Sequence, residues 1–330
     1  MRLLIPSVPS PAAFTRRAAD GQVALLAGGT MGTRWSVRVV ARAGGPPASL
    51  AAGIQAVLDR VVAQMSHWEA GSDLSRFNRS RGWQGLPPEF ILVLDTALQV
   101  ARLSDGAFDP AIGSLVDLWG FGPPGAGAAP PSPEAIAEAL GKGGWHQILL
   151  DSLGLRARRS GTAQLDFSGI AKGFAVDRVA QWLIGQGLVH CLVEVGGELR
   201  GSGLKPDGQP WWVDLEAPPG LALPMNRVAL HQLSVATSGD YRRVFNHKGT
   251  RYAHSLDPRT GWPVKNGVAS VTILHESCML ADAWATALMV LGEAAGMALA
   301  EAQGLSALMV VRENGRARES LSPALQAMRE

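Results

Sequence analysis

Hydrophobic and polar positions along the chain follow two periodicities, one typical of strands and one typical of helices. From Arg34 to Val40 apolar and polar side chains alternate, which predicts a strand with one buried face. From Ser49 to Met65 apolar residues recur every three or four positions, which predicts an amphipathic helix. The same patterns predict helices over 87–104, 132–140, 174–186 and 279–303, and strands over 148–150, 155–157, 191–195, 211–215, 268–274 and 307–311.

The segments between these elements are polar or rich in glycine and proline. Residues 66–85, 105–122 and 122–133 show neither periodicity, and we expect loops there. The predicted strands occur both as hairpins and between helices. This mixture favours an α+β fold over a doubly wound parallel sheet.

Composition and charge narrow the class of protein. Of the 330 residues 47% are hydrophobic, which excludes a disordered chain and allows a sizeable core. The 30 lysines and arginines against 28 acidic residues give a formal net charge of +2, which predicts neither a nucleic-acid groove nor a polybasic membrane surface. The 39 glycines indicate many tight turns and close backbone approaches.

The N-terminus and the cysteines exclude further classes. Prolines at positions 6, 9 and 11 interrupt the first residues, so a secretory signal is not expected. No stretch approaches 18 apolar residues, so we expect no membrane span. We expect residues 1–25 to form a disordered or loosely packed lead before one domain over 26–330. Cys191 and Cys278 are too few for a disulfide framework and read as buried thiols.

A first candidate for chemistry is an acidic residue in an alanine-rich helix. Asp282 and Thr286 are four residues apart, so carboxylate and hydroxyl project from one helix face about 6 Å apart. A carboxylate among apolar neighbours needs a partner, because burying it alone is costly. A hard cation such as Mg²⁺ would satisfy both oxygen ligands. The alternative is that Asp282 is a charge in the first turn of its helix.

A second candidate is the glycine-rich segment from Leu165 to Phe174, which joins a strand to a helix. Its backbone N–H groups and Lys172 could contact a phosphate, although the segment matches neither a Walker A motif nor GxGxxG. A plain strand-to-helix connection is the alternative reading.

Further candidates combine turn residues with reactive or aromatic side chains. The segments 235–241 and 252–261, the second with His254, could be ordinary turns with a structural histidine. The segments 105–110 and 118–122 place aromatic rings beside glycine. That arrangement suits stacking on a flat ligand ring or packing beneath a loop.

Together and in this order, these segments resemble the ApbE-type FAD:protein FMN transferases, which are Mg²⁺-dependent. The matching segments are 31–33, 73–78, 106–110, 119–122, 166–173, 195–198, 237–241, 254–261 and 281–286. So many motifs in one order are not a chance match. The resemblance implies a single large α+β domain with a mostly antiparallel sheet and packed helices.

The resemblance also implies a reaction and its alternatives. Such an enzyme binds FAD, joins the FMN half to a Ser or Thr hydroxyl of an acceptor flavoprotein, and releases AMP. Some relatives hydrolyse FAD to FMN and AMP, so a Mg²⁺-dependent FAD pyrophosphatase is an alternative. A non-catalytic flavin-binding protein is another, which Asp282, Thr286 and His254 disfavour.

Residue by residue, the resemblance assigns a site. The metal ligands would be Asp282, Thr286, the carbonyl of Gly169, and Ala285. The FAD site would be lined by Met31, Trp68, Ala107, Phe108, Asp109, Asp166, Lys172 and Ser255. His254 matches the histidine that the family needs for transfer, and it could take a proton from the acceptor hydroxyl or orient the phosphate.

The chain departs from the family pattern in three places. Trp68 stands where relatives more often have Tyr, which keeps a flat ring and loses a hydroxyl. Ser255 replaces a usually apolar neighbour of the histidine. The N-terminus lacks the signal or lipobox of many relatives, which favours a cytoplasmic enzyme over a periplasmic or inner-membrane-associated one. The acceptor consensus of the family's partners is not found here, so self-modification is not expected.

Overall fold

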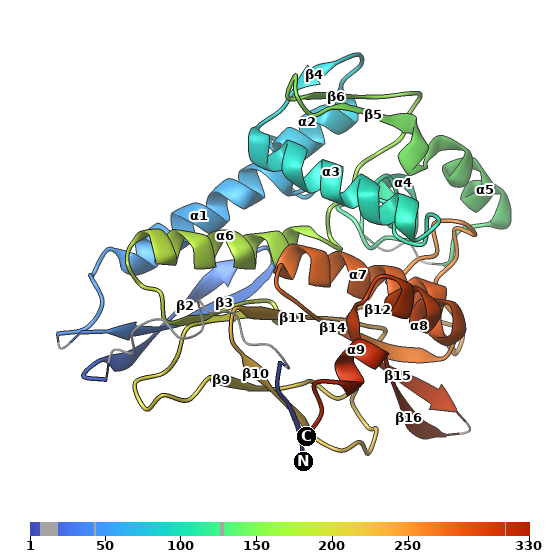
Figure 1. Cartoon of the computed structure of the whole chain (residues 1–330). Helices are drawn as coiled ribbons and strands as arrows, with labels where there is room; N and C mark the ends of the chain where they lie inside the picture. The colour runs from blue at the N-terminus through green and yellow to red at the C-terminus, as the bar shows by residue number, and fades with distance from the viewer. Residues whose placement is uncertain (7–18, 43, 126–128, 314) are drawn as a thin grey trace.

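An eight-stranded, fully antiparallel sheet forms the centre of the computed structural model, which describes residues 1–6, 19–42, 44–125, 129–313 and 315–330 (Figure 1). In spatial order its strands are β16 (Arg316–Leu321), β15 (Ser306–Glu313), β14 (Val268–His275), β11 (Leu233–Gly239), β8 (Glu198–Ser202), β7 (Cys191–Val195), β3 (Thr33–Ala41) and β2 (Gln22–Thr30). Every neighbouring pair in this sheet is antiparallel. The predicted α+β class with a mostly antiparallel sheet is confirmed.

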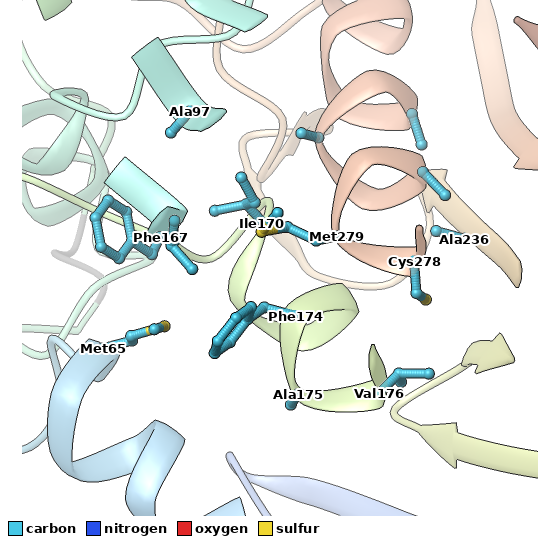
Figure 2. Packing of buried hydrophobic residues seen from close by; sticks show 14 of the residues in the cluster. Met65, Ala97, Phe167, Ile170, Phe174, Ala175, Val176, Ala236, Cys278 and Met279 are labelled. Carbon is cyan, nitrogen blue, oxygen red and sulfur yellow. The ribbon is translucent and has the colours of Figure 1, made fainter. Parts of the chain in front are cut away.

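Helices cover one face of this sheet (Figure 1). α6 (Ala171–Gly185) lies on β7 and β8, and α7 (Cys278–Leu291) lies on β11 and β14. The other helices are α1 (Leu50–Met65), α2 (Asp73–Arg79), α3 (Pro88–Leu103), α4 (Gly113–Leu118), α5 (Pro133–Lys142), α8 (Glu293–Ala302) and α9 (Pro323–Gln326). The largest apolar cluster lies between the sheet and α1, α2, α3, α6, α7 and α8, and Phe167, Phe174 and Met279 belong to it (Figure 2), whereas Leu325 of α9 packs in a second cluster.

Three smaller sheets accompany the large one in the described part of the chain. β1 (Arg2–Leu4), β10 (Asn226–Leu230) and β9 (Trp211–Asp214) form one, β4 (Gln84–Gly85), β6 (Arg156–Arg159) and β5 (Ile148–Asp151) a second, and β12 (Val244–His247) and β13 (Thr250–Ala253) a two-stranded ribbon. The first of them packs through Leu4 and Val228 against Val235 and Leu274 of the large sheet, in a second apolar cluster. The large sheet therefore carries helices on one face and part of a second sheet on the other.

Most predicted elements are present, with ends within three residues of those expected. The helix predicted over 279–303 is wrong as a single element, because Gly292 breaks it into α7 and α8. Gly292 has a φ of +79°, a conformation that ends a helix and that glycine adopts at little cost. The loops predicted over 66–85 and 105–122 contain the short helices α2 and α4, and the Ser72 side chain caps α2 by accepting from the Ser75 N–H.

Two other expectations concern terminal and loop segments. Of the predicted loop over 122–133, residues 126–128 lie outside the described residues, and 122–125 and 129–132 form neither helix nor strand. Of the predicted loose lead over 1–25, residues 7–18 lie outside them. On either side, β1 pairs in parallel with β10, and β2 begins at Gln22, so these parts of the lead are strands.

The cysteine prediction is confirmed, because Cys191 and Cys278 are both buried and unpaired. Among the helices that the structure describes, none is long and apolar enough to cross a membrane.

Candidate active site

The site is built on a close crossing of α6 and α7. A Cβ atom on Gly173 would lie 2.2 Å from the Cys278 carbonyl oxygen, so only glycine allows the two helices to approach this closely. The approach places Oδ2 of the buried Asp282 3.0 Å from the Gly173 N–H, which donates to it. Asp282 therefore caps the N-terminus of the neighbouring helix, whereas the sequence alternative placed its charge in the first turn of its own helix.

Oxygen donors converge beside Asp282. The Thr286 hydroxyl, one turn further along α7, lies 3.2 Å from the Ser238 hydroxyl of β11. A Cβ atom on Gly169 would lie 3.0 Å from Thr286 Oγ1, so the backbone of Gly169 passes directly beside that hydroxyl. Carboxylate, hydroxyl and carbonyl oxygens are the ligands that Mg²⁺ prefers, so these residues fit a hard cation.

The types of ligand near Asp282 bear on which metal ion could bind there. Nowhere in the described ranges do three or more His, Cys, Asp or Glu side chains gather into a metal-binding group. A cation at Asp282 would therefore depend on hydroxyl and carbonyl oxygens as its further ligands. Ala285 is buried inside α7, where its carbonyl belongs to the helical hydrogen-bond ladder, and its role as a ligand stays a prediction.

Lys172 is the cation of the site. It is the second residue of α6, and its ammonium forms an ion pair with Glu198, a buried residue of β8. Burial disfavours the charged form of Lys172, but the carboxylates of Glu198 and Asp282 outweigh it and raise the pKa of this lysine. Burial also raises the pKa of Glu198, whose Oε2 has no hydrogen-bond partner among the residues that the structure describes. Lys172 is thus held charged beside the oxygen donors, where it could contact a phosphate.

His254 is held in one orientation by the backbone. Its Nδ1 lies 3.2 Å from the Arg243 carbonyl oxygen, and its backbone N–H donates to the same oxygen at 3.1 Å. Because a carbonyl only accepts, we assign the ring proton to Nδ1, which leaves Nε2 as an acceptor. Burial, with the nearby charges of Arg243, Lys172 and Arg242, lowers the pKa of His254 to about 4. The imidazole is therefore neutral at pH 7 and can accept a proton.

Arg243 also connects His254 to Trp68. Its guanidinium lies 5.7 Å from the centre of the Trp68 ring, and 52% of Trp68 is exposed, so the ring has a free face. Next to it, His67 Nδ1 lies 3.3 Å from Asp166 Oδ2, while Asp166 Oδ1 accepts from the Ser168 N–H at 2.7 Å. Asp166 is thus fixed between the Trp68 segment and the glycine-rich segment.

The segments around Phe108 and Met31 border the same centre. A Cβ atom on Gly169 would lie 3.3 Å from the Phe108 ring, and Ala107 and Phe108 are both buried. Met31 is in the turn between β2 and β3 with a φ of +50°. A Cβ on Gly196 would lie 2.9 Å from Thr33, the residue of β3 that follows the turn, and 3.5 Å from Lys172.

Asp109 and Ser255 are not linked to this centre by any described side-chain contact. The Asp109 carboxylate accepts from the N–H groups of Ala111 and Trp145, and burial raises its pKa to about 6. It borders a cavity of about 340 Å³ that Arg259 also lines. The Ser255 carbonyl accepts from the Val264 N–H.

Four residues at the site were not predicted. Ser238, His67, Glu198 and Arg243 each contact a predicted site residue. Ser238 and Glu198 lie within the matched segments 237–241 and 195–198, so the motif pointed to them without a role. His67 and Arg243 act through contacts that only the folded chain shows.

Fold and site together place the chain in the class of α+β proteins represented by flavin transferase structures. It is similar to the flavin transferase ApbE from Vibrio cholerae, with a TM-score of 0.86 and 36% identity over 93% of this chain and 99% of that one. It is similar to the apo form of the flavinyl transferase ApbE of Pseudomonas stutzeri, with a TM-score of 0.86 and 38% identity over 93% and 97% of the two chains.

The chain belongs to the ApbE family, whose model matches residues 31–309. A relative from Vibrio cholerae named FAD:protein FMN transferase is 37% identical over 91% of both chains. A relative of the same name from Escherichia coli K12 is 31% identical over 93% of this chain and 89% of its own. The family resemblance inferred from the motifs is confirmed.

Proposed function

We propose that the protein is a Mg²⁺-dependent FAD:protein FMN transferase that attaches FMN to a Ser or Thr hydroxyl of an acceptor flavoprotein and releases AMP. The observation that carries the proposal is the convergence of Asp282, Thr286 and Gly169 with Lys172 in a fold shared with proteins of that name. His254 is neutral, and Lys172 is one of the charges that lower its pKa. In the proposal His254 is the base.

The cation would be held by Asp282, Thr286 and the Gly169 carbonyl, with the Ala285 carbonyl as a further predicted ligand. When bound, Mg²⁺ neutralises pyrophosphate charge and polarises the attacked phosphorus. Lys172 adds a fixed positive charge beside the same oxygens, and Glu198 holds that ammonium in place.

The transfer step is a displacement at phosphorus. The acceptor hydroxyl oxygen forms a bond to the phosphorus of the FMN phosphate, and the bond from that phosphorus to the bridging oxygen breaks. AMP leaves with the bridging oxygen. The hydroxyl proton passes to His254 Nε2, which is free to accept it because Nδ1 is engaged with the Arg243 carbonyl.

The flavin half would lie on the aromatic and apolar surface around the centre. Trp68 offers an exposed ring face, Phe108 borders Gly169, and Met31 lies in the β2–β3 turn next to Thr33. The remaining FAD contacts in the proposal are Ala107, Asp109, Asp166 and Ser255.

Incubation with FAD and Mg²⁺, with and without an acceptor domain that carries the family's Ser/Thr motif, tests the proposal. We expect protein-bound flavin and AMP only when acceptor and Mg²⁺ are both present. Free FMN with no protein-bound flavin in every condition would instead identify a pyrophosphatase. FAD binding that survives EDTA with no AMP released would identify a non-catalytic flavin-binding protein.

A further inference from the structure

The chain as a whole is close to neutral, but one of its segments is strongly basic. Residues 240–254 contain Arg242, Arg243, Lys248 and Arg251 against the single acid Asp240, while the whole chain has a net charge of only +2. This segment comprises the β12–β13 ribbon and its two flanks, and it ends at His254. The ribbon is therefore a local concentration of positive charge beside the proposed base.

The acids near the ribbon do not neutralise it. Asp240 is shared by two guanidinium groups, with Arg251 Nη1 3.2 Å from Oδ2 and Arg312 Nη2 3.0 Å from Oδ1. Glu216 pairs with Arg242 at 2.6 Å. Within the described part of the chain, neither Arg243 nor Lys248 has a carboxylate partner, and both are exposed. A net positive surface remains.

The ribbon is anchored on one face and open on the other. Phe245 and Tyr252 are paired across the strands, and the Tyr252 ring lies 5.4 Å from the ring of the buried Trp119. Asn246 and Arg251 are paired on the opposite face and are exposed. This second face presents Asn246 and Arg251 to solvent, whereas Ala253, on the same face, is buried.

The ribbon carries a further cation at its tip, away from His254. Lys248 lies in the turn between β12 and β13. The first residue of β13, Thr250, is three residues before the last, Ala253, which is about 10 Å along the strand. The cations that act on His254 are Arg243, Lys172 and Arg242, and Lys248 is not one of them. Lys248 thus lies on the exposed turn of the ribbon, apart from the cations around His254.

We propose that the β12–β13 ribbon is the docking surface for the acceptor protein, and that it binds an acidic segment beside the hydroxyl to be modified. This inference rests on the proposed function, because the acceptor hydroxyl must reach His254, and the ribbon leads directly to that residue. Complementary charge steers encounter and fixes register between partners. The location beside His254 favours a protein acceptor over a membrane surface as the occupant.

A peptide binding experiment with the full chain tests the inference. The probe is a fluorescein-labelled 15-residue peptide with a central threonine flanked on each side by three aspartates, and its companion has glutamines instead. The variants are Lys248→Glu and, as matched control, Arg316→Glu, an exposed basic residue at the turn of the β15–β16 hairpin. Fluorescence anisotropy at low and high salt gives the dissociation constants.

We expect the aspartate peptide to bind about tenfold more tightly than the glutamine peptide at low salt, with the difference lost at high salt. Lys248→Glu should remove most of that difference, and Arg316→Glu should leave it unchanged. The dissociation constant for FAD should be the same in all three proteins.

Three outcomes would overturn the inference. Equal affinity for both peptides would show that the ribbon does not select an acidic segment. A parallel loss of FAD binding in Lys248→Glu would show that the ribbon binds FAD instead. Loss of binding to phosphatidylglycerol vesicles in Lys248→Glu, with unchanged peptide binding, would assign it to a membrane. Failure of the proposed function is a separate result, because it appears as no flavin transfer by the unmodified protein to any acceptor.

Discussion

At the scale of single residues, the proposed chemistry depends on the state of His254. The Arg243 carbonyl accepts a hydrogen bond from the protonated Nδ1, and burial with nearby cations keeps the ring neutral. A histidine in this state resembles the bases of other group-transfer sites, where orientation matters as much as basicity.

Replacing His254 with glutamine keeps a polar side chain and removes the ring base. A positioned base contributes about 10²–10⁴-fold to a rate, so we expect transfer to fall at least about 100-fold while FAD still binds. Single-turnover transfer and an FAD titration measure the two effects. Unchanged transfer would remove His254 from the mechanism.

The lowered pKa of His254 predicts an unusual pH profile. The group must be deprotonated to act as a base, so activity is retained at higher pH and lost as pH falls through its pKa of about 4. The acid limb of kcat/KM should therefore lie well below the ordinary histidine pKa of about 6.5. An acid limb near that ordinary value would show that burial does not control this residue.

Asp282 combines a structural and a proposed metal-binding role, and one substitution separates them. In Asp282→Asn the side-chain oxygen can still accept from the Gly173 N–H, but the charge that would hold Mg²⁺ is lost. We expect little change in thermal stability and at least a tenfold rise in the Mg²⁺ concentration needed for AMP release. A normal Mg²⁺ dependence would contradict the assignment, and Asp282→Ala should additionally destabilise the fold.

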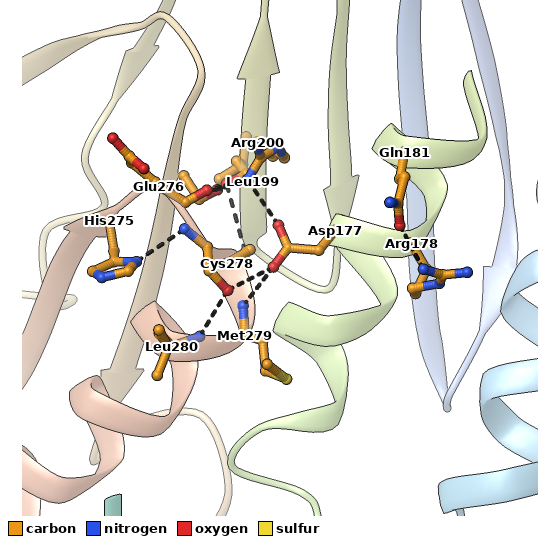
Figure 3. A network of polar contacts seen from close by, with 12 residues as sticks. Asp177, Arg178, Gln181, Leu199, Arg200, His275, Glu276, Cys278, Met279 and Leu280 are labelled. Carbon is orange, nitrogen blue, oxygen red and sulfur yellow. Dashed lines mark hydrogen bonds and ion pairs between the residues drawn. The ribbon is translucent and has the colours of Figure 1, made fainter. Parts of the chain in front are cut away.

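At the scale of elements, a polar network fixes the two helices that carry the site (Figure 3). Asp177 of α6 accepts from the Ser277 hydroxyl at 2.9 Å and the Met279 N–H at 3.0 Å, both at the start of α7. Arg200 of β8 donates to the same carboxylate at 2.9 Å. The network holds α6, α7 and β8 together, and these elements carry Lys172, Asp282 and Glu198.

Removing this carboxylate should loosen the crossing of α6 and α7. Asp177→Ala leaves the donors at the start of α7 without their acceptor, and we expect a loss of about 2–3 kcal/mol in the free energy of unfolding. Urea denaturation measures the loss. As a control, Asp177→Asn keeps one acceptor oxygen and should lower the free energy of unfolding by less. Equal stability of the unmodified protein and both variants would contradict the role of the network.

The elements also show where sequence patterns suffice and where they do not. α1 and β3 were predictable because each has one buried face and one exposed face, which produces a clear periodicity. β11 was not, because helices and a second sheet cover it on both sides and no alternation results. α2 and α4 are too short to complete a periodic pattern.

The sequence named candidate residues that the folded chain brings close together, but not how they are assembled. The motifs identified Asp282, Thr286, Lys172 and His254, because these residue types recur with the family's segments. The capping of α6 by Asp282 depends on the approach of Gly173 to Cys278, which no local pattern encodes. His67 and Arg243 were missed for the same reason.

At the scale of the whole molecule, net charge proved a poor guide to local charge. The value of +2 predicted neither a nucleic-acid groove nor a polybasic membrane surface, but it does not show that residues 240–254 hold four cations against one acid. The net charge is close to zero because acidic residues elsewhere in the chain offset the positive charge of the ribbon. Binding surfaces are therefore better sought from charge along segments than from the total.

Binding of FAD and Mg²⁺ should be coupled in the whole protein. A ligand that binds only the native state raises Tm, and a cation shared by Asp282 and the pyrophosphate binds best when both are present. We expect FAD and Mg²⁺ together to raise Tm by more than the sum of their separate effects, and Asp282→Asn to abolish the excess. Strictly additive shifts would argue against a shared cation.

The central claim, transfer of FMN from FAD to an acceptor protein, is tested most directly by the intact mass of the acceptor together with the AMP released. After incubation with this protein, FAD and Mg²⁺, we predict an acceptor heavier by one FMN less water, with one AMP for each modified chain and neither product in EDTA. An unmodified acceptor, with FMN and AMP free in equal amounts, would contradict the claim.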